Sequence, residues 1–285
     1  MIAQNTKQIL KENEVMAKKF YGQNFLVNED ILKRICEVAS LSKDDYVLEI
    51  GVGLGALTEY LASNAKKVLC YEIDEEMYEI SQKNLKSFDN IEFILADFLK
   101  RNVKEDIESC FGKGAKVKVV ANLPYYVTTK IMIKLFELDC IREEVFMVQK
   151  EMGERFTGEV STKDYNALSV YVKYFSDAKI AFSVSKGNFY PAPEVDSVVL
   201  FLKPNKKELG IDNESKFLKF VKASFAHRRK TFVNNISSAY RFPKADLEGK
   251  LESLGLNKNI RSEEIDLEGF AIIYKKLFEE KKDES

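Results

Sequence analysis

The chain has 285 residues, of which 45% are hydrophobic and 12% aromatic, enough for one sizeable core and a smaller second domain. Its formal net charge of −1 gives no overall sign of a polyanionic partner, so any nucleic-acid-binding surface must be local. The only histidine is His227, which argues against a histidine-based metal site or a serine–histidine–aspartate triad, and we expect no metal.

The four cysteines are widely spaced and contain no C-x-x-C pair, a pattern typical of reduced thiols in a cytoplasmic protein. Residues 1–14 are polar and unlike a signal peptide, and no apolar run is long enough to cross a membrane. We therefore expect a cytoplasmic protein without a membrane partner. Nothing in the sequence demands more than a monomer.

The amino-terminal part has a weak pattern. Residues 6–13 are weakly helical and are predicted to belong to a mobile leader, residues 1–17. Residues 18–26 mix polar and aromatic side chains without a period, which fits a lid or ordered loop as well as an ordinary linker. Asn28 is typical of an N-cap, and the apolar positions after it predict the buried stripe of a helix: Ile31, Leu32, Ile35, Val38 and Ala39.

A glycine-rich turn follows the first predicted strand. Residues 46–50 form an apolar strand that runs into Gly51, Gly53 and Gly55, and residues 56–62 then form an amphipathic helix. Glycines let the backbone approach a ligand closely, and the helix amino terminus adds a favourable dipole. The spacing differs from the dinucleotide fingerprint. With Glu49 ahead, it resembles the S-adenosylmethionine loop of class I methyltransferases; the alternative is a tight strand-to-helix turn.

Two acidic residues stand at the ends of the next strands. The strand at residues 68–71 ends at Glu72, about twenty residues past the glycines, where an acid can hold both ribose hydroxyls of a cofactor. The strand at residues 91–96 ends at Asp97, where an acid can accept from a cofactor adenine. Either acid alone fits a helix cap or a solvated charge, but the pair favours a cofactor site that also includes Ile73 and Phe98.

A polar tetrapeptide follows the fourth predicted strand, residues 117–121; it consists of Asn122, Leu123, Pro124 and Tyr125. Asn-x-Pro is also ordinary turn chemistry. However, an Asn side-chain oxygen and a neighbouring main-chain carbonyl can both accept from one exocyclic amino group, while a Tyr offers a stacking face. Two such acceptors favour a pyramidal nitrogen with a free lone pair. The tetrapeptide therefore suggests methyl transfer to a flat, amino-bearing base.

The order of elements indicates an α/β fold. A helix at residues 128–138 and a fifth strand at 145–148 complete a β-α alternation, which implies a mainly parallel sheet with helices on both faces. Residues 168–175, 178–183 and 195–202 are further strand candidates, and their close spacing predicts antiparallel pairing. The proline-rich residues 188–197 either present Phe189 or Tyr190 towards the site or start an edge strand.

The carboxyl-terminal part is predicted to be helical after a linker at residues 204–210. We therefore place a catalytic domain at residues 1–204 and a small all-α domain at 205–285. Residues 215–245 contain eight basic and no acidic residues. Such a run is often only a solvated face, but the absence of acids favours phosphate contact. The expected RNA-binding residues are Lys222, Arg228, Arg229 and Lys230.

Together these motifs resemble the ribosomal RNA adenine N6-dimethyltransferases from Lys18 onward. The resemblance lies in G-Q-N-F-L at residues 22–26, E-I-G-x-G-x-G at 49–55, N-L-P-Y at 122–125, F-x-P-x-P-x-V-D-S at 189–197 and R-R-K-T at 228–231. The R-R-K-T stretch and the helical tail look more like the enzymes for 16S RNA than those that act on 23S RNA. Val52 and Asn166 depart from the usual Pro and Gly, and we expect only local backbone changes there.

The resemblance implies a class I, Rossmann-like methyltransferase with a mainly parallel seven-stranded sheet. Its cofactor would be S-adenosyl-L-methionine, lined by Asn24, Leu26, Gly51, Glu72, Asp97 and Asn122, with Gln23 close by. Asn122 and the Leu123 carbonyl would hold the target amino group, and Tyr125 and Phe189 would sandwich a flipped adenine. The expected product is N6,N6-dimethyladenosine at two adjacent adenosines of 16S RNA, in the loop of the hairpin near its 3′ end, within the assembling small subunit.

Other functions remain possible on the residues alone. A 23S RNA adenine methyltransferase that confers antibiotic resistance shares most of these motifs. A non-catalytic ribosome-assembly factor could keep the same fold, because binding and catalysis use overlapping surfaces. A nicotinamide oxidoreductase would need a third glycine at the longer spacing and a residue for hydride chemistry, and the sequence offers neither.

Overall fold

The computed structural model describes residues 1–13, 24–124 and 127–279, and these divide into two compact units. The first unit contains residues 1–153 and 179–204, and the second contains residues 154–178 and 205–285. The division differs from a single cut at residue 204, because residues 154–178 group with the carboxyl-terminal helices. No helix within the described ranges is both long and apolar enough to span a membrane.

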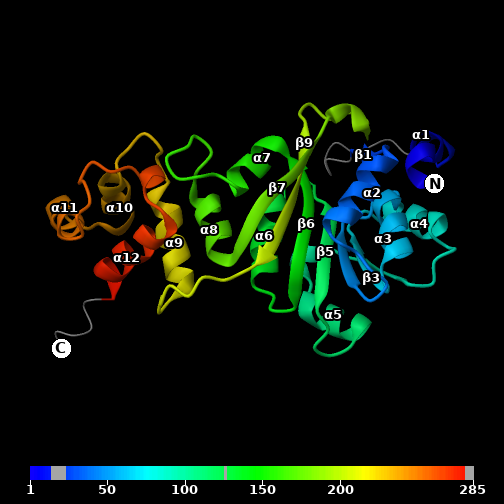
Figure 1. The fold of residues 1–285 in the computed structure, drawn as a ribbon, viewed down its shortest axis with the longest axis horizontal. Coiled ribbons are helices and arrows are strands. Elements are labelled where there is room, and N and C mark those ends of the chain that lie inside the picture. Colours follow the sequence, from blue (N-terminus) through cyan, green and yellow to red (C-terminus); the bar gives the residue numbers. More distant parts are fainter. Residues whose placement is uncertain (14–23, 125–126, 280–285) are drawn as a thin grey trace. The chain divides into compact units, whose positions relative to one another are not determined.

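The first unit is built on a seven-stranded sheet with the order β4-β3-β2-β5-β6-β9-β7. Figure 1 shows β5, β6 and β9 side by side in this sheet. Neighbours from β4 to β6 pair in parallel, and β9 is antiparallel to β6. This confirms the predicted class I, Rossmann-like architecture. The strands are β2 (Tyr46–Ile50), β3 (Lys67–Glu72), β4 (Ile91–Leu95), β5 (Val117–Asn122), β6 (Ile141–Gln149), β7 (Ser176–Val184) and β9 (Ser197–Pro204).

Helices flank this sheet because each has an apolar stripe to bury. The predicted N-cap Asn28 accepts from the N–H of Asp30 and starts α2, whose Leu32 and Ile35 share one core cluster with Val47 and Val68 of the sheet. From α2 to α7 in chain order, the helices are α2 (Glu29–Val38), α3 (Ala56–Asn64), α4 (Glu75–Asn84), α5 (Val103–Phe111), α6 (Thr128–Phe136) and α7 (Lys150–Phe156), with a 3-10 turn η2 (Phe98–Lys100).

The expected mobile leader is wrong for residues 1–13. They form the packed helix α1 (Ile2–Glu12), which buries Ile2, Ala3 and Leu10 in the core of the first unit. The main-chain N–H of Ile2 also donates to the Glu59 carboxylate on α3, at 2.8 Å. The buried positions 2, 3, 6 and 10 lie on one face of the helix. The sequence pattern of this face is weak because the other positions of the helix are polar. Residues 14–17 lie outside the described residues.

A second, two-stranded sheet joins distant parts of the first unit. β1 (Phe25–Leu26) is antiparallel to β8 (Phe189–Tyr190), with Phe25 opposite Tyr190 and Leu26 opposite Phe189. The side chain of Asn28 extends the contact by donating to Asn188 at 2.8 Å. The amino-terminal motif and the proline-rich motif are therefore neighbours, and the latter does start a short strand.

Residues 168–175 were predicted as a strand, and this is wrong: Ala167–Phe175 is helix α8. Its β-branched and aromatic residues favour a strand locally. A capping box overrides that preference, because Asn166 accepts from the N–H of Leu168 and the hydroxyl of Ser169 accepts from the N–H of Asn166. Asn166 has extended backbone (φ −159°) and serves as the helix cap.

The second unit consists of helices that pack around aromatic side chains. These helices are α8, α9 (Glu214–Ser224), α10 (Phe232–Tyr240), α11 (Lys244–Ser253) and α12 (Leu267–Phe278), with a 3-10 turn η4 (Ser262–Glu264). The predicted helical tail is therefore confirmed. Phe220 meets the rings of Phe232, Phe270 and Tyr274 at centroid distances of 5.7–6.3 Å. Edge-to-face and tilted contacts of this kind add to the free energy of burial.

Candidate functional site

A cavity of about 360 Å³ opens in the first unit at the carboxyl ends of the parallel strands. It brings together most of the predicted site residues: Asn24, Leu26, Glu49, Gly51, Gly53, Glu72, Ile73, Asp97, Phe98, Asn122, Leu123 and Pro124. Gly55 does not line it, and Gln23 and Tyr125 lie outside the described residues. Residues from the ends of β2, β3, β4 and β5 thus meet in one site.

The three glycines of the loop all adopt left-handed backbone, with φ of +83° at Gly51, +57° at Gly53 and +91° at Gly55. Only glycine takes this conformation without steric cost. Gly53 is also crowded, because a Cβ there would lie 3.2 Å from the ring of Phe25. Gly55 is the N-cap of α3. The loop therefore exposes its main chain to the cavity, as a nucleoside site requires.

Glu72 organises the same loop from β3. Its carboxylate accepts main-chain hydrogen bonds from Gly53 (2.9 Å), Ile73 (2.8 Å) and Asp74 (2.9 Å). The side chain is 6% exposed, and burial raises its pKa while the three N–H donors act in the opposite direction. A buried carboxylate at this position can share its remaining lone pairs with the hydroxyls of a ribose.

Glu49 adds a second buried carboxyl to the cavity wall. It is 1% exposed, and burial raises its pKa to about 8, with the charge of Glu72 adding to the shift. The thiol of Cys70 donates to it at 3.5 Å. Asp97 is the third acid of the lining, and among the described lining residues none is Lys, Arg or His. This lining fits a cationic ligand such as a sulfonium donor better than a pyrophosphate.

The turn after β4 forms another wall. Asp97 caps η2 by accepting from the N–H of Leu99 at 3.0 Å, and Phe98 is buried and lines the cavity. Tyr71 packs edge-on against Phe98 with ring centres 5.2 Å apart. Sequence reading missed Tyr71 and Leu99 as lining residues, although both directly adjoin predicted ones in the chain.

The acceptor turn lies against the glycine loop. Asn122 is the last residue of β5 and pairs with Met147 of β6, whose carbonyl accepts from the N–H of Leu123 at 3.1 Å. A Cβ built on Gly51 would lie 3.8 Å from Pro124 Cδ and 3.9 Å from the main-chain oxygen of Asn122. The loop that would hold the donor and the turn that would hold the acceptor are therefore neighbours, separated by about the space of one added methyl group. Met147 also lines the cavity and was missed.

Phe189, which was predicted to stack on a substrate base, is 4% exposed and does not line the cavity. Its ring belongs to the core cluster that includes Phe25 and Leu26. Its neighbour Tyr190 is 39% exposed, with the ammonium of Lys7 5.0 Å from its ring centre. Alternation along β8 turns these two rings to opposite sides.

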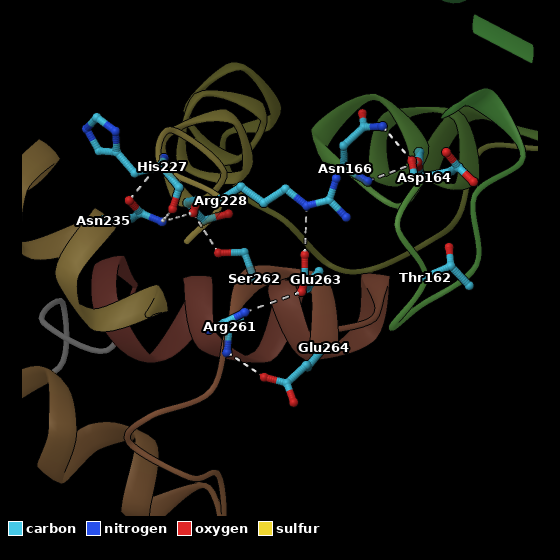
Figure 2. Close-up of polar contacts among 12 residues, drawn as sticks. Thr162, Asp164, Asn166, His227, Arg228, Asn235, Arg261, Ser262, Glu263 and Glu264 are labelled. Atoms are coloured by element: carbon cyan, nitrogen blue, oxygen red, sulfur yellow. Dashed lines mark hydrogen bonds and ion pairs between the residues drawn. The ribbon is translucent and has the colours of Figure 1, made fainter. Parts of the chain in front are cut away.

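The predicted RNA-binding residues lie together in the second unit. Lys222 is in the last turn of α9, and Arg228, Arg229 and Lys230 occupy an exposed turn between α9 and α10. Figure 2 shows Arg228 reaching Glu263, with Nε 3.1 Å from Oε2, and Arg261 approaching the same carboxylate at 4.0 Å. One charge of the turn is therefore already partly neutralised. Sequence reading missed this, because Glu263 is distant in the chain.

The buried side chain of Asn235, a residue that is 2% exposed, forms hydrogen bonds with the main chain next to this turn. Its side chain accepts from the N–H of His227 (3.2 Å) and donates to the carbonyls of Ser224 (2.6 Å) and His227 (3.2 Å), as Figure 2 shows for His227. The hydroxyl of Ser262 donates to the Ser224 carbonyl as well, at 2.6 Å. The basic side chains thus project from a fixed backbone.

Within the described part of the chain, no group of three or more His, Cys, Asp or Glu side chains is arranged to hold a metal ion. Of the acidic cavity residues, Glu72 accepts hydrogen bonds from main-chain N–H groups and Asp97 caps a turn.

Comparison with known proteins gives a consistent result. The sequence model of the family described as "Ribosomal RNA adenine dimethylase" matches residues 15–278. The chain is 42% identical to "Ribosomal RNA small subunit methyltransferase A" of Leuconostoc mesenteroides, over 94% of this chain and 92% of the relative. It is 41% identical to the protein of the same name in Bacillus cytotoxicus, over 94% of each chain.

Solved structures agree with the sequence comparisons. A dimethyladenosine transferase of Plasmodium falciparum is similar with a TM-score of 0.74 and 26% identity, over 90% of this chain and 98% of that one. A 23S rRNA methyltransferase is similar with a TM-score of 0.66 and 25% identity, over 89% and 99% of the two chains. The likeness spans both units in each case.

Proposed function

Because the chain belongs to the ribosomal RNA adenine dimethylase family, we propose that it methylates N6 of two adjacent adenosines of 16S RNA, in the loop of the hairpin near its 3′ end. Family membership makes it an S-adenosylmethionine-dependent methyltransferase for ribosomal RNA. The observation that supports methyl transfer at this site is the proximity of the glycine loop to the acceptor turn, because a Cβ added to Gly51 would lie 3.8 Å from Pro124. Donor and acceptor can react only where two such sites meet.

The cavity residues fit S-adenosylmethionine, which supplies an electrophilic methyl group when bound. Glu72 would accept from the ribose hydroxyls, and Asp97 from the adenine amino group, with Ile73 and Phe98 on the faces of the base. Glu49 would face the cationic part of the ligand. Asn24 and Leu26 close the cavity from β1, and all of these residues line it. Gln23, just before them, is proposed to complete that edge.

Asn122 and the carbonyl of Leu123 would orient the adenine amino group by accepting its two hydrogens. The amino nitrogen then directs its lone pair towards the methyl group, and its proton leaves only after the nitrogen has become cationic. No strong general base is needed, which agrees with a site whose nearby carboxyls are occupied by hydrogen bonds. Tyr125 and Phe189 would stack on the flipped base. For Phe189 this requires its ring to leave the core cluster when RNA binds.

The basic turn of the second unit would contact phosphates of the RNA. Arg229 and Lys230 are exposed, and the buried Asn235 fixes the backbone that carries them. Lys222 extends the same basic surface along α9. A preformed set of cations binds a polyanion with less loss of conformational entropy than flexible lysines do. We propose that this surface and the acceptor turn bind the same RNA, in a monomer that works on the assembling small subunit in the cytoplasm.

The 23S alternative has less support. The relatives at 41–42% identity are named as small-subunit enzymes, whereas the 23S rRNA methyltransferase among the solved structures is 25% identical. A non-catalytic assembly factor would have no need for the acidic cavity or for the proximity of Gly51 to the acceptor turn. Both features favour an enzyme, and the names of the relatives favour 16S RNA as its substrate.

The direct test is methyl transfer to unmethylated small subunits with labelled S-adenosylmethionine. We expect the unaltered protein to label two adjacent adenosines of 16S RNA, located by mass spectrometry of RNA fragments. Asn122→Ala should abolish labelling while particle binding stays within about twofold, because only one amide is lost. Labelling of free 23S RNA instead, or full activity of Asn122→Ala, would refute the proposal.

A further inference from the structure

The helix that follows the acceptor turn carries a lysine that reaches the opposite wall of the cavity. The ammonium of Lys134, on α6, donates to the main-chain carbonyls of Leu99 (2.9 Å) and Arg101 (2.7 Å). It also lies 5.5 Å from the ring centre of Phe98. Lys134 does not itself line the cavity, but Phe98 and Leu99 do. The Lys134 ammonium therefore contacts two residues of the cavity wall without lining the cavity itself.

The same helix is joined at its start to the acceptor turn. The carbonyl of Pro124 accepts from the N–H of Val127 at 3.2 Å and from the hydroxyl of Thr128 at 3.0 Å. Since α6 runs from Thr128 to Phe136, its hydrogen-bond ladder connects Pro124 to Lys134 over two helical turns. A shift of the acceptor turn and a shift of the wall can therefore be connected through α6.

The wall that Lys134 grips is itself closed into a ring of contacts. Arg101 Nε donates to Asp106 at 3.0 Å, and the same carboxylate accepts from the hydroxyl of Tyr71 at 2.6 Å. The ring of Tyr71 in turn packs on Phe98. The Arg101 guanidinium keeps the pKa of Asp106 below its usual range, so this carboxylate stays charged. These contacts connect the turn after β4 to α5 and to β3.

We infer that Lys134 is a positioning residue that couples the donor wall at Phe98 and Leu99 to the acceptor turn at Asn122 to Pro124. The inference rests on the proposed function and deepens it. When a nucleoside fills the cavity against Phe98, the wall is fixed, and α6 transmits that constraint to the residues that grip the target amino group. The wall and α6 are joined by the two hydrogen bonds from the Lys134 ammonium to main-chain carbonyls. The coupling should therefore be lost when this cation is removed.

The test compares three variants of the full chain for binding of S-adenosylhomocysteine, measured by calorimetry. Lys134→Met keeps the aliphatic stem and removes both donors, and it should weaken binding about tenfold. Lys134→Arg can still donate to two carbonyls and should restore affinity to within about threefold. Lys130→Met is the matched control, because Lys130 is an exposed lysine one turn earlier on α6; its affinity should be unchanged.

A second readout separates coupling from a merely structural effect. S-adenosylhomocysteine should increase the affinity of the unaltered protein for unmethylated small subunits. In Lys134→Met, the ratio of subunit affinities with and without this ligand should fall towards one. The subunit affinity measured without the ligand should stay the same. Equal ligand affinity and equal coupling in Lys134→Met would overturn the inference. If that variant fails to fold, equal affinities of Lys134→Gln, Lys134→Arg and the unaltered protein would overturn it instead. Absence of ligand binding to the unaltered protein would count against the proposed function, not against Lys134.

Discussion

The carboxylate of Glu72 accepts a 2.9 Å hydrogen bond from the main-chain N–H of Gly53, so the acid at the end of β3 fixes the loop at the end of β2. Two strands that are parallel neighbours thus share one polar contact at their carboxyl ends. The acid has two tasks, to shape the loop and to present lone pairs to a ligand. The first task makes its removal costly even without a ligand.

Glu72→Ala should therefore lower both stability and ligand affinity. Three main-chain N–H groups lose their acceptor, and we expect an affinity for S-adenosylhomocysteine at least tenfold weaker, since a hydrogen bond to a charged group contributes about 1.5–3 kcal/mol. Calorimetry and thermal unfolding would measure the two effects. Glu75→Ala, at an exposed site in the first turn of α4, is the control and should leave the affinity unchanged.

Gly53→Ala should destabilise the first unit by about 1–3 kcal/mol, because a left-handed residue with a Cβ is strained and the new methyl group would also press on the Phe25 ring. Urea unfolding would measure the change. Gly249→Ala is a sharp control: Gly249 is inside α11, with nothing within 4 Å of its Cβ position, so alanine should stabilise there by about 0.5–1 kcal/mol. A neutral result at Gly53 would mean that the loop can relax.

Glu144 predicts a dependence of stability on pH. It is on β6 and 1% exposed, neither carboxyl oxygen has a hydrogen-bond partner among the described residues, and burial raises its pKa to about 8. The unfolded chain releases this proton near its ordinary pKa of about 4.5, while the folded chain keeps it until about pH 8. The folded state thus binds more protons in this window, and the free energy of unfolding should fall as pH rises through it.

Glu144→Gln removes that contribution. Glu49, with a similarly raised pKa, gives the unaltered protein a second slope of the same sign, so the informative quantity is the difference between the two proteins. We expect Glu144→Gln to gain on the order of 3–4 kcal/mol relative to the unaltered protein between pH 5 and pH 8. Urea unfolding at both pH values would show it; parallel curves would mean that water or a movement of the strand solvates this carboxyl.

The basic turn predicts unequal contributions to RNA binding. Arg229→Gln and Lys230→Gln should each reduce the slope of log affinity against log salt by about one. Arg228→Gln should reduce it less, because Glu263 lies 3.1 Å from its guanidinium. Glu263→Gln should raise affinity for the same reason. Filter binding of the RNA hairpin across a salt series measures this, with Lys258→Gln, an exposed site elsewhere in the second unit, as control. Equal slopes for all variants would place the RNA on another surface.

Much of the site could be predicted because it depends on local rules. Glycines that need a left-handed backbone and acids at strand ends are visible in the sequence, and parallel pairing brings the strand ends together. Long-range pairing was not predictable in the same way. The β1–β8 sheet joins Phe25 to Tyr190 across the chain, and the partner of Arg228 is Glu263. Neither contact leaves a periodic pattern in the residues concerned.

The misassigned segments have physical reasons as well. The residues of α8 favour a strand one by one, but the cap at Asn166 and burial in an aromatic core decide for a helix. α1 has few apolar residues, yet they share one face, and the hydrogen bond to Glu59 fixes its first turn. The sequence places Phe189 in the proline-rich motif, but it does not predict whether the ring lines the cavity or is buried. Its burial in the cluster with Leu26 depends on the β1–β8 pairing.

The carboxyl groups around the cavity have a consequence for turnover. Each modified adenosine consumes two donors, and each transfer turns a sulfonium into an uncharged thioether. The described lining contains Glu72 and Asp97 but no Lys, Arg or His, so we expect it to attract the charged form more strongly than the neutral one. We therefore expect the spent product to be held less tightly than fresh donor, and the loss of one positive charge to favour the exchange between successive methylations.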